Sequence, residues 1–260
     1  MWNQQPSTTD RKRFGIDIGG TTVKCGLFTT NGELCDKWEI VTRTEDGGKE
    51  ILPDVAKAIC EKMQEKGITR EQVTGVGVGV PGPVIKEREV TVAVNLHWGY
   101  TMLADELEKL LNGIPVKVGN DANVAALGEM WKGGGEGTRS LIMVTLGTGV
   151  GGGIIVDGKI VTGSHGAGGE IGHACVDPSE TETCNCGNRG CLEQMASATG
   201  IVRLARKILA EETENTVLNP EKISAKDIFD AYKEGDTVAA KIVDRFAEYL
   251  GNALGIFGCV

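Results

Sequence analysis

The chain has 260 residues, enough for one large domain or two small ones around a sizeable hydrophobic core. Its 40% hydrophobic and 24% charged residues are ordinary for a globular protein and exclude a disordered or collagen-like chain. The net charge of -9, without a long run of Lys and Arg, argues against a nucleic-acid-binding surface.

Residues 1–13 are predicted to be a disordered tail, because they begin with a polar stretch that lacks the apolar segment of a signal peptide. No apolar run reaches the length of a membrane span, so we expect a cytoplasmic protein without membrane contacts. In the cytoplasm the eight cysteines do not form a disulfide framework. Five of them are expected to be mostly buried free thiols in apolar surroundings: Cys25, Cys35, Cys60, Cys175 and Cys259.

Short apolar runs separated by glycine predict alternating strands and helices in the first half of the chain. The expected strands are residues 14–18, 23–28, 34–41, 73–80 and 116–118, and the expected helices are residues 51–66, 103–112 and 122–131. Between the second and third strands, Asn31-Gly32 predicts a two-residue hairpin turn, because this pair readily adopts positive φ. Gly67 is expected to end the first helix.

The second half repeats this opening scheme. Residues 141–146 and 153–156 are predicted strands around a glycine turn at 147–149, and Asp157-Gly158 predicts a hairpin turn. The repeat predicts two related α/β domains across a cleft, residues 14–119 and 120–260. Three helices are expected at residues 197–210, 224–232 and 237–254, with Ser224 and Asp227 as a cap of the second.

Glycine-rich loops connect the first two strands of each half. Gly147–Gly152 matches the pattern G-x-G-x-x-G of dinucleotide-binding proteins, but a strand follows it where that motif requires a helix. The two loops, Gly19–Thr22 and Gly147–Gly149, are therefore either plain hairpin turns or nests of N–H groups for phosphate oxygens. Asp17, at the close of the first strand, favours phosphate binding, because a carboxylate can hold Mg²⁺.

A histidine and three closely spaced cysteines suggest a metal site. The candidate ligands are His173, Cys184, Cys186 and Cys191. Three thiolates and one imidazole complete a tetrahedral structural site for Zn²⁺; the alternative is three buried thiols and a surface histidine. We predict zinc, which would make the segment that carries Glu170 and Glu193 rigid.

Six motifs follow one another in the order of a known family. They are Asp17-Ile-Gly-Gly-Thr21, Gly79-Val-Pro-Gly-Pro83, Asn120-Asp-Ala-Asn123, Gly147-Thr-Gly149, Gly169-Glu-Ile-Gly-His173 and Cys184-Asn-Cys-Gly-Asn-Arg-Gly-Cys-Leu-Glu193. With them the chain resembles, from Phe14 to its end, the ROK family (repressors, open reading frames, sugar kinases), and most closely its bacterial glucokinases. The resemblance implies an α/β, actin-like ATPase (ribonuclease H-like) fold, and transfer of phosphate from ATP and Mg²⁺ to the 6-hydroxyl of glucose.

The resemblance also assigns roles to individual residues. Asp121 matches the general base that takes the proton of the sugar hydroxyl. The residues that match the ATP and Mg²⁺ site are Asp17, Gly19, Gly20, Thr21, Lys24, Gly147, Thr148 and Gly149. Those that match the hexose site are Gly82, Asn95, Asn120, Asp121, Glu170, His173 and Glu193. His173 would serve both zinc and sugar, with one ring nitrogen for each.

Several alternatives stay open on the residues alone. Asp121 has the alternative role of a helix N-cap, and Glu170 and Glu193 that of solvated surface charges. Within the family, the substrate alternatives are N-acetylglucosamine, N-acetylmannosamine or fructose, and the donor alternative is polyphosphate. A sugar-sensing protein without turnover is a further hypothesis, although the thirteen residues before Phe14 leave no room for the DNA-binding domain of ROK repressors. The resemblance implies a homodimer and predicts that the chain is truncated before its adenosine-binding segment.

Overall fold

The computed structural model describes residues 11–259, so most of the predicted disordered tail lies outside the described residues. The end of that prediction is wrong, because Lys12 and Arg13 already pair with Thr29 and Phe28 in the first sheet. The chain divides into two compact units. Unit 1 runs to Ala125 and includes Thr162–Ala167, and unit 2 comprises Ala126–Val161 and the residues from Gly168 onward. The predicted domain boundary after Gly119 stays a prediction.

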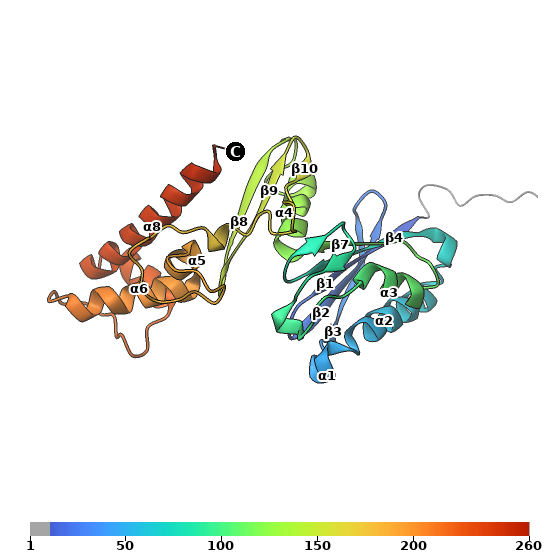
Figure 1. Cartoon of the computed structure of the whole chain (residues 1–260), viewed down its shortest axis with the longest axis horizontal. Helices are drawn as coiled ribbons and strands as arrows, with labels where there is room; N and C mark the ends of the chain where they lie inside the picture. The colour runs from blue at the N-terminus through green and yellow to red at the C-terminus, as the bar shows by residue number, and fades with distance from the viewer. Residues whose placement is uncertain (1–10, 260) are drawn as a thin grey trace, which may run out of the picture. The chain divides into compact units, whose positions relative to one another are not determined.

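Unit 1 is built on a five-stranded mixed sheet with the order β3-β2-β1-β4-β7 (Figure 1). Its strands are β1 (Lys12–Ile18), β2 (Thr22–Thr29), β3 (Leu34–Val41), β4 (Val73–Val80) and β7 (Val116–Asn120). The first three strands are antiparallel neighbours, whereas β4 and β7 run parallel to β1. As a consequence β1, β4 and β7 end at the same edge of the sheet, where Asp17 lies in register with Gly79 and Gly79 with Gly119.

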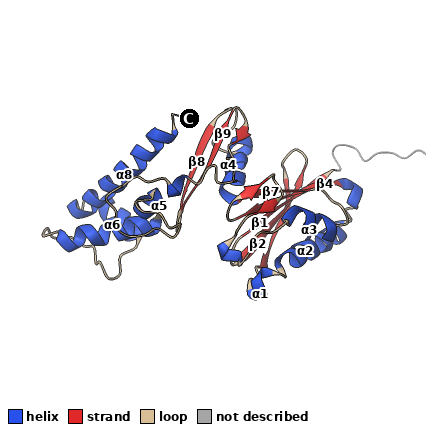
Figure 2. Ribbon diagram, viewed as in Figure 1, coloured by secondary structure: helices blue, strands red, loops and turns tan. Residues whose placement is uncertain are grey.

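Two amphipathic helices cover the sheet of unit 1. Helix α2 (Ile51–Lys66) and helix α3 (Leu103–Leu110) pack against each other (Figure 2) and bury their apolar side chains in one core with Phe14 and Ile16. Gly67 ends α2 in the left-handed conformation with φ 63°, as predicted. The smaller elements of this unit are α1 (Glu45–Gly48), η2 (Arg70–Gln72), β5 (Val84–Ile85), β6 (Glu89–Val90) and η3 (Val94–Leu96).

Unit 2 combines a three-stranded antiparallel sheet with a group of helices (Figure 2). The strands are β8 (Leu141–Leu146), β9 (Val150–Val156) and β10 (Lys159–Ile160). The helical elements are η4 (Ile171–His173), α5 (Leu192–Ala196), α6 (Ala198–Glu211), α7 (Ala225–Lys233) and α8 (Thr237–Phe257), and α4 (Asp121–Lys132) continues into this unit from unit 1. Helices α6, α7 and α8 share a core. In it the rings of Phe229 and Phe246 pack edge to face, with their centroids 5.8 Å apart.

The predicted internal repeat is present in the strands. β8, β9 and β10 follow one another as antiparallel neighbours, as β1, β2 and β3 do. Asp157 and Gly158 both have positive φ, so the predicted hairpin turn between β9 and β10 is confirmed. The predicted cap of α7 is also confirmed, because Ser224 and Asp227 form a capping box. No helix among residues 11–259 is long and apolar enough to cross a membrane.

Three local predictions are wrong. The connection after β2 spans residues 30–33 rather than two, because Thr29 N–H bonds to Glu33 O and only Gly32 has positive φ. β9 begins at Val150, three residues before the predicted start, and pairs there with Leu146. Of the five scattered cysteines only Cys25 is buried; the other four lie on outward-facing positions. Burial raises the pKa of the Cys25 thiol to about 11.

Candidate active site

The end of the unit 1 sheet brings two predicted carboxylates close to one glycine. Asp17 lies near the end of β1 beside Gly79 of β4, and Asp121 begins α4 directly after β7. A Cβ atom on Gly79 would stand 3.8 Å from Asp17 Oδ1 and 3.7 Å from the Cα atom of Asp121. Parallel strands that end together therefore place the two acidic residues, which are distant in sequence, around Gly79.

The structure separates the two roles considered for Asp121. Asn120 caps α4, since its Oδ1 accepts the Asn123 N–H at 3.1 Å while its Nδ2 donates to Gly82 O at 3.2 Å. Asp121 Oδ1 accepts the N–H of the next residue, Ala122, at 2.8 Å. The alternative of Asp121 as the helix N-cap is thus wrong, and its carboxylate is not needed to start the helix.

The environment of Asp121 favours its protonated form more than water does. Partial desolvation of the carboxyl group, although Asp121 is exposed, and the negative charge of nearby Asp17 raise its pKa above the ordinary value of 3.8. Hydrogen bonds from the Ala122 N–H, its own N–H and Asn120 oppose this shift without cancelling it. A carboxylate with a raised pKa is a stronger base, which suits a group that accepts a proton from a hydroxyl.

The first glycine loop, residues 19–21, is bound to its own strands and to a buried threonine. Gly19 N–H donates to Thr22 O at 3.0 Å, and the hydroxyl of Thr42 donates to Gly19 O at 2.7 Å. Lys24 lies opposite Asp17 on β2, with Nζ 3.9 Å from a carboxylate oxygen, and both side chains are exposed. The predicted phosphate and magnesium residues of unit 1 therefore form one exposed group at the end of the sheet.

Two further residues predicted to line the hexose pocket lie close to this group in unit 1. Gly82 has φ 98°, and a Cβ atom there would come within 2.2 Å of Val92 O, so only glycine fits. Asn95 in η3 is exposed, and its backbone oxygen would lie 3.4 Å from a Cβ atom on Gly20. The Asn95 segment thus packs directly against the first loop.

In unit 2 the four predicted zinc ligands come together. The ligand atoms of His173, Cys184, Cys186 and Cys191 all lie within 4.8 Å of one another. The Sγ atoms of Cys186 and Cys191 are 3.6 Å apart, and Cys184 Sγ is 3.8 Å from His173 Nδ1. A tetrahedral zinc ion with Zn–S bonds of about 2.3 Å separates its sulfur ligands by about 3.8 Å. The four residues therefore fit a zinc ion. If His173 binds it through Nδ1, the other ring nitrogen, Nε2, is left for a second partner.

Without a metal the Cys191 thiol holds its proton firmly. Burial, together with the neighbouring Cys186 and Cys184, raises the pKa of Cys191 to about 12. Three thiolates in one small volume repel one another, and a bound divalent cation compensates that charge. The donor set therefore suits a bound cation better than three free thiolates.

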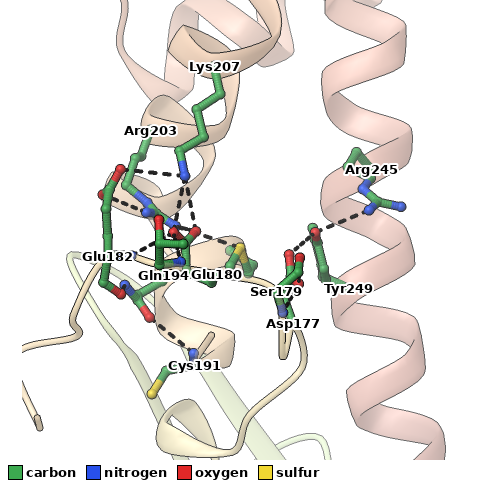
Figure 3. A network of polar contacts seen from close by, with 12 residues as sticks. Asp177, Ser179, Glu180, Glu182, Cys191, Gln194, Arg203, Lys207, Arg245 and Tyr249 are labelled. Atoms are coloured by element: carbon green, nitrogen blue, oxygen red, sulfur yellow. Dashed lines mark hydrogen bonds and ion pairs between the residues drawn. The ribbon is translucent and has the colours of Figure 1, made fainter. Parts of the chain in front are cut away.

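Polar contacts fasten the loop between His173 and Cys184 to the helices of unit 2 (Figure 3). Glu180, 5% exposed in its side chain, accepts hydrogen bonds from Arg203 and Lys207 of α6. Burial would raise the pKa of Glu180, but hydrogen bonds from the Glu182 N–H and from Lys207, with the charges of both cations, outweigh it, so the pKa lies below its ordinary value. On α8, Tyr249 donates to Asp177 Oδ2 at 2.8 Å. No sequence motif had marked these bracing residues.

The second glycine loop lies beside Glu193. Glu193 Oε2 accepts the N–H of Val150 at 3.0 Å, and a Cβ atom on Gly149 would come within 2.2 Å of the same oxygen. Glu193 and Glu170 are both half-buried rather than solvated surface charges. Glu170 directly precedes η4, which ends at His173. Unit 2 therefore holds the second loop, the two glutamates and the candidate metal site.

Comparisons with known proteins show which family this chain belongs to. The model of the ROK family matches residues 13–258. A glucokinase from Halalkalibacterium halodurans is 44% identical over 251 residues, which cover 95% of this chain and 76% of that protein. A crystal structure of a ROK hexokinase from Thermus thermophilus matches with a TM-score of 0.77 at 30% identity, over 95% of this chain and 77% of that chain. A ROK family glucokinase from Streptomyces griseus, in complex with glucose and AMPPNP, matches with a TM-score of 0.69 at 33% identity, over 95% and 79%.

The mixed sheet, the repeated strand–loop–strand units and these structural neighbours define an actin-like ATPase fold, as predicted. Within that class, the chain belongs to the ROK family.

Proposed function

We propose that this protein is a glucokinase, which transfers the γ-phosphoryl group of ATP to the 6-hydroxyl of glucose. The observation that carries the proposal is the placement of Asp17 and Asp121 around Gly79, next to the first glycine loop. Phosphoryl transfer needs charge compensation at the phosphates and a carboxylate that accepts the proton of the attacking hydroxyl. The names of the relatives, a glucokinase and a glucokinase with glucose and AMPPNP, support the same reaction.

In this proposal the residues of the candidate site act on the proton, the phosphates and the sugar. Asp121 is the general base. Asp17 and the first loop hold Mg²⁺ and phosphate oxygens, and Lys24 lies near them. Gly147–Gly149 is the second phosphate loop. Hexose hydroxyls meet polar side chains that can both donate and accept, which suits Asn, Asp, Glu and His. The groups assigned to this task are Asn120, Asp121, Glu170, His173 and Glu193, together with the Gly82 and Asn95 segments.

Zinc has a structural task in this proposal. The ion would be held by His173, Cys184, Cys186 and Cys191, and four protein ligands leave no open position for chemistry. It would fix the orientation of the His173 ring, whose second nitrogen then faces a sugar hydroxyl. The homodimer, which the resemblance implies, and the cytoplasmic location stay predictions.

A coupled assay of ADP release tests the proposal. We expect ATP-dependent turnover with glucose that exceeds turnover with N-acetylglucosamine, N-acetylmannosamine and fructose, and little turnover when polyphosphate replaces ATP. Preferred turnover of another sugar would move the assignment to another hexose kinase. Sugar binding by calorimetry without any ADP release would instead identify a sugar-sensing protein.

A further inference from the structure

The second glycine loop is bound from one side by the start of α6. Ala198 N–H donates to Gly147 O at 2.8 Å, and the hydroxyl of Thr199 donates to Thr148 O at 2.7 Å. Ala198 is the first residue of α6, so its N–H has no partner within the helix and is available to the loop. Two consecutive carbonyl groups of the loop therefore point toward α6.

The direction of these carbonyl groups determines where the loop amides point. In a trans peptide the C=O of one residue and the N–H of the next point in opposite directions. When Gly147 O and Thr148 O face α6, the N–H groups of Thr148 and Gly149 face away from it. Two neighbouring amides that point the same way form a nest for an anion such as a phosphate oxygen.

The hydroxyl of Thr199 is itself held in a directed chain of hydrogen bonds. Gly200 N–H donates to Ser197 Oγ at 2.8 Å, and Ser197 Oγ lies 3.0 Å from Thr199 Oγ1. A hydroxyl has one hydrogen, and that of Thr199 goes to Thr148 O. Ser197 must therefore donate to Thr199, so the chain runs from Gly200 through both hydroxyls to the loop carbonyl. Ser197 is 1% exposed, which fixes the chain at its buried end.

We propose that Thr199 is a positioning residue for the phosphoryl donor: its hydroxyl orients the peptide between Thr148 and Gly149 so that the Gly149 amide faces a phosphate. This inference rests on the proposed kinase function and names a residue outside the six motifs. The first loop has the same arrangement, since the Thr42 hydroxyl donates to Gly19 O at 2.7 Å. In each loop, therefore, a threonine from outside the loop donates a hydrogen bond to a loop carbonyl. Both loops connect two successive antiparallel strands.

The test compares Thr199→Val, which keeps the size of the side chain but removes the hydroxyl, with Thr199→Ser, which keeps the hydroxyl. KM for ATP and KM for glucose are measured by ADP release, and the Kd for ATP with Mg²⁺ is measured by calorimetry without sugar. In Thr199→Val we expect KM and Kd for ATP to rise about fivefold, the scale of one lost hydrogen bond, and KM for glucose to stay within about twofold. Thr199→Ser should behave like the wild type.

Thr237→Val is the matched control, because Thr237 also donates from the first turn of a helix in unit 2, to Glu214, far along the chain from the loop. It should leave both KM values unchanged. An unchanged KM for ATP in Thr199→Val, an equal rise of both KM values, or a Thr199→Ser variant as weak as Thr199→Val would overturn the inference. If Thr199→Val does not fold, Thr199→Ala against Thr199→Ser gives the same comparison. If the wild type phosphorylates no sugar, the proposed function fails, while the Kd for ATP still decides the role of Thr199.

Discussion

The two glycine loops share a frame but differ in what surrounds them. Gly19–Thr21 lies at the end of a sheet, beside the carboxylates of Asp17 and Asp121. Gly147–Gly149 lies beside Glu193 and the start of α6, in the unit that also holds the candidate metal ligands. In the proposed function the repeated strand–loop–strand unit would supply two anion nests. The different neighbours would then give unit 1 the groups for proton and metal chemistry and unit 2 the groups for positioning.

Asp121→Asn should have the largest effect, because it removes the base from the neighbourhood of the first loop. We expect kcat to fall by roughly a hundredfold or more, the usual size of a general-base contribution, with little change in hexose affinity. The variant keeps the shape of the side chain, and Asn120 still caps α4. ADP release gives kcat, and calorimetry with glucose gives the affinity. Asp244→Asn, on the exposed surface of α8, is the matched control and should be fully active.

The same substitution has a pH-dependent effect on stability. A raised pKa means that the folded protein binds the Asp121 proton more tightly than the unfolded chain does. Its contribution to stability is present below the unfolded pKa and is lost as the pH rises through the folded pKa. Asp121→Asn should therefore melt at the same or a slightly higher temperature than the wild type at pH 7, and this advantage should vanish at low pH. A clear loss of stability at pH 7 would contradict this account.

Cys186→Ser tests whether the second unit acts by positioning. Loss of one ligand should release most of the zinc, lower the melting temperature and weaken hexose binding about tenfold, because His173 loses its fixed orientation. Elemental analysis, thermal melts and calorimetry measure these changes, and the wild type should contain close to one equivalent of zinc. Cys60→Ser, at an exposed cysteine of α2, should change none of them. If the wild-type protein contained no zinc and still bound glucose normally, zinc would have no role in positioning His173.

Gly149→Ala tests the contact between the second loop and Glu193. The new Cβ atom would come within 2.2 Å of Glu193 Oε2, so the carboxylate must leave its place beside the Val150 N–H. We expect KM to rise severalfold for both ATP and glucose, because Glu193 belongs to the predicted hexose site and also holds the loop. Steady-state kinetics with each substrate varied in turn measure the effect. Gly251→Ala, where no atom outside the neighbouring helix backbone lies within 4 Å of the new Cβ, is the control. A rise for ATP alone would mean that Glu193 serves only the loop.

Much of this arrangement could be predicted from local patterns in the sequence. Apolar periodicity and turn residues identify α2, β4 and the β9–β10 hairpin, because each depends on neighbours close in the chain. The spacing of Cys184, Cys186 and Cys191 likewise predicts a convergence that the structure has. The loop after β2 was misjudged because the hydrogen bond between Thr29 and Glu33, not the Asn-Gly pair, sets its length.

The rest depends on contacts between distant segments, which no local pattern encodes. Asp17 and Asp121 meet at Gly79 only because β1, β4 and β7 are parallel and in register. Asn120 rather than Asp121 caps α4 because β7 extends to Asn120, a boundary that propensity alone does not fix. Thr42 and Thr199 carry no motif, and their hydroxyls gain significance only from the loop carbonyls that they contact.

The smallest expected effect compares these two threonines directly. Thr42 is 7% exposed, whereas Thr199 is exposed, although both donate to a loop carbonyl at 2.7 Å. In Thr42→Val the hydroxyl is lost where water cannot easily replace it, so the free energy of unfolding should fall by about 1 kcal/mol. In Thr199→Val water can solvate the exposed carbonyl without fixing the direction of the peptide, so the loss of stability should stay below about 0.5 kcal/mol. Urea unfolding measures the free energy of unfolding of both variants, and KM for ATP should rise in each.

Equal losses of stability would show that burial does not distinguish the two loops. An unchanged KM for ATP in Thr42→Val would confine the positioning role to the second loop.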